Sequence, residues 1–116
     1  MRGNFHRKIV GQQNHREDFD SLYEAILQLK TPNECERFLT DICTPAELLA
    51  LAERWRVALL LEDGQLSYRD IHERTGVSVT TIGRVARFLS QEPYQGYSLV
   101  IQRLKELKKK PALTAR

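Results

Sequence analysis

Hydrophobic residues recur along the chain at the spacing of α-helices, and no segment alternates convincingly in the manner of a β-strand. The pattern predicts an all-α fold of about six helices with short connections. The predicted helices are one that carries residues 19–29, one that begins near Pro32 and includes Ile42, and helices over about 45–62, 67–74, 79–90 and 94–109. We expect a flexible basic arm over residues 1–16, one helical domain over 17–110, and a tail over 111–116.

The helix predicted over residues 45–62 is the most apolar segment of the chain. Its apolar residues cover more than one face: Leu48, Leu49, Leu51, Ala52, Trp55, Ala58, Leu59 and Leu60. A helix that is apolar on several sides must be surrounded by other residues. A chain of 116 residues has few other apolar segments that could cover it. We therefore expect a second copy of the chain to supply part of the cover, in a homodimer.

Residues 67–90 have the pattern of a helix-turn-helix. Ser67 starts a short helix, Ser78 is suited to cap the next one, and Gly76 can adopt a positive φ in the turn between them. A helical projection of residues 79–90 places Thr80, Arg84 and Arg87 opposite the apolar edge. Such a face fits the major groove of DNA, where arginine contacts guanine or phosphate. The same apolar spacing also occurs in helix pairs that contact no DNA.

The charge of the chain is unevenly distributed. The whole sequence carries +3, whereas residues 1–63 carry −3 and residues 64–116 carry +6. A basic C-terminal half favours a polyanionic partner. No run of about 18 apolar residues is present, so we expect no membrane association and a cytoplasmic protein.

The residues that carry most enzyme and metal chemistry are few and scattered. Cys35 and Cys43 would lie roughly 12 Å apart on one helix, which is too far for a disulfide, and we interpret them as small buried apolar residues. The three histidines form no recognisable catalytic or metal-binding spacing. We predict neither an enzyme nor a metal site.

Several motifs together resemble the Trp repressor family and its relatives of unknown ligand. They are "LKTPNECERF", "TPAE", the arginines on both sides of Trp55, the glycine turn, and "TIGR", within a similarity that spans roughly residues 19–107. The resemblance implies an intertwined, all-helical homodimer with one helix-turn-helix per subunit. It further implies a transcriptional repressor that binds a roughly palindromic operator in double-stranded DNA.

The resemblance also assigns roles to individual residues. Arg69 and Thr81 match DNA-contacting positions of the family, and His72 stands where the family has a lysine. The full predicted DNA-binding set is Arg69, His72, Ser78, Val79, Thr80, Thr81, Arg84 and Arg87.

A corepressor pocket is implied as well, with L-tryptophan as the family's ligand. Arg54 and Arg84 match the two arginines that bracket the indole and hold its carboxylate, and Thr44 belongs to the adjoining turn. Val85 replaces a glycine and Phe88 replaces a serine. Both residues add bulk, so we expect tryptophan not to bind in the usual pose and no cofactor to be required. We hypothesise that Phe88 fills part of the pocket itself; the alternative is a different or differently oriented ligand.

A second function from another class fits the same fold. A helix-turn-helix protein can act as an adaptor that binds RNA polymerase or another protein. In that case Phe88 and Tyr94 would be exposed anchors.

Overall fold

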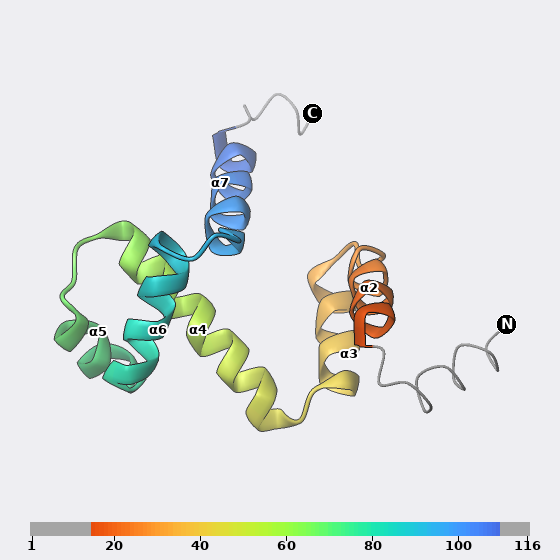
Figure 1. The fold of residues 1–116 in the computed structure, drawn as a ribbon, viewed down its shortest axis with the longest axis horizontal. Coiled ribbons are helices and arrows are strands. Elements are labelled where there is room, and N and C mark those ends of the chain that lie inside the picture. Colours follow the sequence, from red (N-terminus) through yellow and green to blue (C-terminus); the bar gives the residue numbers. More distant parts are fainter. Residues whose placement is uncertain (1–14, 110–116) are drawn as a thin grey trace, which may run out of the picture. The chain divides into compact units, whose positions relative to one another are not determined.

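The computed structural model describes residues 15–109, and over this range the chain forms six α-helices and no strand (Figure 1). The helices are α2 (His15–Ile26), α3 (Pro32–Ile42), α4 (Pro45–Asp63), α5 (Tyr68–Thr75), α6 (Val79–Ser90) and α7 (Gly96–Lys109). The predicted all-α class is confirmed. Residues 1–14 of the predicted arm and the predicted tail lie outside the described residues. No described helix has the length and apolar character needed to cross a bilayer.

The described residues fall into two compact units that divide between Thr44 and Pro45, and each is described by itself. The single domain expected over residues 17–110 stays a prediction. In the first unit, α2 begins at His15, so residues 15 and 16, which the prediction assigns to the arm, are helical. Arg16 forms a hydrogen bond with Asp20 one turn later, which lowers the pKa of the Asp20 carboxyl.

Local chemistry sets the limits of α3. Thr31 is the N-cap and accepts a hydrogen bond from the Glu34 amide at 3.1 Å, while the Lys30 amide donates to the Glu34 carboxylate at 2.9 Å. Pro32 occupies the first turn, where its missing N–H leaves no donor unpaired. Cys35 and Cys43 are free thiols that are only partly buried, so their predicted burial is wrong.

The first unit covers very little of its apolar surface. No residue of α2 or α3 is buried. Its exposed large hydrophobic residues are Phe19, Tyr23, Ile26, Leu27 and Ile42. These side chains need a cover that this unit does not provide on its own.

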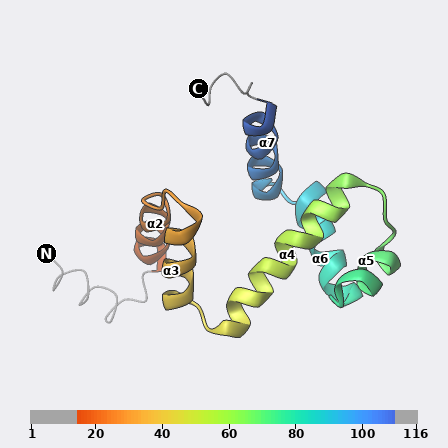
Figure 2. The ribbon, with the colours of Figure 1, turned by 180° about the vertical axis from the view of Figure 1, so that it is seen from behind.

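In the second unit, α5, α6 and α7 gather around the C-terminal part of α4 (Figure 2). The core cluster contains Val57 and Ala58 of α4, Ile71 of α5, Val77 of the turn, and Ile82 and Val85 of α6. By contrast, Leu49 and Leu51 in the N-terminal half of α4 are 58% and 43% exposed. The apolar excess predicted for this helix is therefore left partly uncovered, in its N-terminal half and also at Leu59.

Candidate DNA-binding surface and adjoining arginine pocket

The helix-turn-helix predicted over residues 67–90 is present, and its first helix is fixed at both ends. At the start of α5, the Asp70 amide donates to Ser67 Oγ at 3.1 Å and the Ser67 amide donates to Asp70 Oδ2 at 3.3 Å, which makes a capping box. At its end, Gly76 has a φ of 78°, a left-handed conformation that glycine adopts without steric strain.

The turn is held by side chains of α5. Thr75 Oγ1 donates to the Ile71 carbonyl at 2.7 Å and accepts from the Val77 amide at 3.1 Å. His72 Nδ1 lies 2.7 Å from the Val77 carbonyl oxygen. Because a carbonyl oxygen only accepts, Nδ1 carries the proton of this bond. Two of these hydrogen bonds hold Val77 of the turn against α5, and the core then packs α6 against α5.

The first turn of α6 is closed by Ser78. Its Oγ accepts from the Thr81 amide at 3.1 Å and donates to Thr81 Oγ1 at 3.1 Å. The Ser78 hydroxyl, which we expected to bind DNA, is thus engaged as an N-cap. Thr81 Oγ1 accepts the Ser78 proton, so its own hydroxyl hydrogen remains available to an acceptor outside the chain.

The outward face of α6 has the composition expected from the helical projection. Ile82 and Val85 are buried in the core, whereas Val79, Thr80 and Arg84 are exposed. Arg69 of α5 is also exposed, and its only ion pair among the described residues is with Glu73, at 3.7 Å. An exposed pair of that length contributes little, so the Arg69 side chain can reorient toward another anion.

Arg87 lies in a different environment from Arg84. Its Nε is 3.2 Å from Glu92 Oε2, beyond the C-terminal end of α6. Its guanidinium also lies over the Phe88 ring, 5.2 Å from the ring centre. Glu92 partly neutralises Arg87 and so weakens its attraction to DNA phosphate. The sequence pattern did not reveal this ion pair.

A small pocket lies where α4, α6 and α7 meet. Its lining consists of Arg54, Arg84, Val85, Phe88 and Tyr97, and its volume is about 80 Å³. The guanidinium carbon of Arg84 is 4.2 Å from the centre of the Phe88 ring, in cation–π geometry. The structure thus brings together four residues of the predicted ligand set. Thr44, the fifth, ends the other unit, and its role stays a prediction.

Tyr97 lines this pocket, and the sequence pattern does not mark it as a pocket residue. Its position on the apolar face of the last helix indicates only that it packs inward. Which helices it meets depends on how α7 crosses α4 and α6, and no local pattern encodes that crossing.

The two arginines of this pocket lack acidic partners in the described part of the chain. The ion pairs found there involve Arg16, Arg69, Arg87 and Lys105, each with a neighbouring carboxylate. Arg54 and Arg84 form none. Arginine stays protonated at any physiological pH, so two positive charges face one small cavity.

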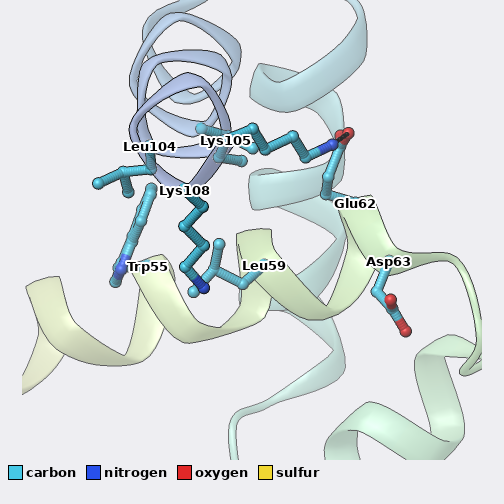
Figure 3. A pocket seen from close by; sticks show the side chains of 8 residues that line it. Trp55, Leu59, Glu62, Asp63, Leu104, Lys105 and Lys108 are labelled. Carbon is cyan, nitrogen blue, oxygen red and sulfur yellow. Dashed lines mark hydrogen bonds and ion pairs between the residues drawn. The ribbon is translucent and has the colours of Figure 1, made fainter. Parts of the chain in front are cut away.

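A larger groove of about 540 Å³ lies between α4 and α7. Trp55, Leu59 and Leu104 line its apolar part, and Lys105 Nζ donates to Glu62 Oε2 at 3.1 Å at its edge (Figure 3). Together with the exposed leucines of α4, this groove extends the uncovered apolar surface of the second unit.

Comparisons with known proteins agree with this geometry. Residues 17–105 match the family described as Trp repressor protein. The chain is 40% identical over 89 residues to the uncharacterized protein YerC of Bacillus subtilis (strain 168), a match that covers 77% of the chain and 84% of that protein. It also resembles the crystal structure of a TrpR-like protein from Eubacterium eligens ATCC 27750, with a TM-score of 0.71 and 40% sequence identity. This match covers 77% of the present chain and 90% of that chain. The chain therefore belongs to the Trp repressor family.

Proposed function

We propose that this protein is a sequence-specific DNA-binding transcriptional repressor that acts as a homodimer on a palindromic operator. The observation that carries the proposal is the exposed face formed by Val79, Thr80 and Arg84 of α6, with Arg69 of α5 also exposed within the same helix-turn-helix. These groups match the chemistry of the major groove. Arginine donates hydrogen bonds to guanine, a threonine hydroxyl can donate to or accept from a base edge, and apolar side chains contact the thymine methyl group. The net charge of +6 over residues 64–116 adds attraction to phosphate.

Selection of DNA from a random library tests this proposal directly. We expect the purified protein to enrich one palindrome with half-sites about 10 base pairs apart. A two-fold dimer presents two helix-turn-helix units, its reading heads, one helical turn of DNA apart. A Thr80→Ala, Val79→Ala variant should enrich a less defined sequence. Absence of any enriched sequence, or an identical sequence from the variant, would contradict the proposed surface.

The proposed regulator binds its operator without tryptophan. A volume of about 80 Å³ is far below the roughly 300–1,000 Å³ of typical small-molecule pockets. Phe88 already supplies an aromatic ring in contact with Arg84. In this proposal the ring packs α6 against Tyr97 of α7 and so holds the reading head in place where other members of the family use a ligand.

The homodimer is supported by the distribution of uncovered apolar surface. α2 and α3 contain no buried residue, and Leu49 and Leu51 of α4 are largely exposed. The described part of the chain buries only seven hydrophobic residues, which is a small core for six helices. A second copy with the same uncovered faces is the simplest complementary partner.

We predict that Leu49→Asp converts the dimer into a monomer. An aspartate at this position would place an unpaired charge in the apolar interface, twice per dimer by symmetry, and should weaken association by more than about tenfold. Sedimentation equilibrium measures the mass. Tyr94→Asp, at an 87% exposed site, is the matched control that should remain dimeric. A wild-type monomer, or equal masses for both variants, would refute the predicted interface.

The adaptor function receives less support. It requires Phe88 and Tyr94 as exposed anchors, and only Tyr94 is exposed. Phe88 is partly buried beneath Arg84 and is therefore not the exposed anchor that this function requires.

A further inference from the structure

Gly83 lies inside α6, where glycine weakens a helix. Its backbone loses more conformational freedom on folding than that of alanine, so glycine at such a position lowers the stability of the protein. Apart from the two adjacent residues and the helix backbone, no atom of the described chain lies within 4 Å of the point where a Cβ of residue 83 would stand. An alanine would therefore fit without a clash, and the packing of the described chain does not require the glycine.

Gly83 belongs to the outward face of α6. Residues three and four positions apart are neighbours on a helix surface, so Gly83 lies beside Val79, Thr80 and Arg87. These three residues are exposed, and Gly83 itself is partly exposed. The bare backbone at Gly83 is thus part of the proposed DNA-binding face.

The surroundings of Gly83 favour an apolar group over a charged one. The Ile82 amide already donates to the Ser78 carbonyl at 3.0 Å, so the Gly83 amide lies beyond the free N–H groups of the first turn. The neighbouring Arg87 pairs with Glu92 at 3.2 Å, which weakens its attraction to phosphate. What the helix offers at this position is the Cα of glycine, which carries no hydrogen-bonding group.

We propose that Gly83 is a specificity-determining residue that admits the methyl group of a thymine to the backbone of α6. This methyl group is the apolar feature that a base pair presents in the major groove. Because Gly83 has no Cβ, the methyl group can reach the helix backbone itself. The inference rests on the proposed function and deepens it, since it names a base that each reading head recognises.

The first test measures Gly83→Ala without DNA. Alanine favours the helix and meets open space, so the Tm should rise by a few degrees. Sedimentation equilibrium should give the mass of the wild type. A lower Tm would show that the glycine serves the fold, and a lower mass would show that it serves the contact with a second copy. Either result would overturn the inference.

The second test removes the methyl group from the DNA. In the operator selected by the wild type, each symmetry-related pair of thymines is replaced in turn by uracil, which lacks only the methyl group. One such pair should weaken wild-type binding about tenfold, since a buried methyl group is worth about fourfold and each half-site contributes once. Gly83→Ala should bind the thymine operator about tenfold more weakly and should lose or reverse the preference for thymine at that pair, because its Cβ takes the place of the thymine methyl group.

Gly96→Ala is the matched control. It adds the same methyl group at an exposed glycine outside the reading head, again with no atom within 4 Å apart from adjacent residues and helix backbone, and should keep the wild-type affinity and thymine preference. A wild type that is indifferent to uracil at every position would overturn the inference, and so would a thymine preference that Gly83→Ala retains in full. A wild type that selects no DNA would overturn the proposed function, and this inference with it.

Discussion

The double variant Arg69→Ala, Thr81→Ala should bind the selected operator at least about 100-fold more weakly than the wild type. A single good base contact is worth about 1–3 kcal/mol, and each substitution occurs in both half-sites of a dimer. Arg69 is exposed and has only a 3.7 Å contact with Glu73, so its truncation removes no packing. Thr81→Ala removes one hydroxyl and keeps the amide that donates to Ser78 Oγ at 3.1 Å. Fluorescence anisotropy provides the two affinities.

Two controls separate base recognition from general effects in that experiment. Thr81→Ser retains a hydroxyl and should recover most of the affinity lost through Thr81. Arg103→Ala removes an exposed arginine of α7 outside the reading head and should change the affinity only slightly. Wild-type sequence preference in the double variant would refute the assignment of α5 and α6 as the reading head.

Ile82→Ala should lower the free energy of unfolding by about 2–5 kcal/mol, the usual range for truncating a fully buried isoleucine. Ile82 has 0% exposure and belongs to the cluster formed by α4, α5 and α6. Val79→Ala, three residues earlier on the same helix and at a 52% exposed site, should stay within about 0.5 kcal/mol of the wild type. Urea unfolding followed by circular dichroism measures both. Equal losses of stability at the two positions would contradict the conclusion that α6 packs on the core through Ile82 and not through Val79.

The helices were predictable from sequence because their limits depend on nearest neighbours. Ser67, Ser78 and Gly76 act through groups a few residues away, and each adopts the predicted role. The end of α2 shows the limit of such reasoning. Leu29 was predicted to be helical, yet the helix ends at Ile26. The amides of Gln28 and Leu29 each donate to the carbonyl three residues earlier, as in a turn, and not four residues earlier as in an α-helix.

The candidate site was predictable only in part. The convergence of Arg54, Arg84, Val85 and Phe88 followed from the family resemblance and is present in the structure. The contribution of Tyr97 was missed because it depends on the packing of α7, which has no local signal. The Arg87–Glu92 pair was missed for a related reason, since it forms where the chain leaves α6 and folds back.

The affinity of the wild-type protein for its selected operator, with and without saturating L-tryptophan, tests most directly whether it binds DNA without a corepressor. We expect the same nanomolar-range binding in both conditions, because Phe88 already contacts Arg84 in the pocket. Operator binding that appears only with tryptophan would contradict it. Such a result would show that Phe88 leaves the pocket to admit an indole and that the protein senses tryptophan.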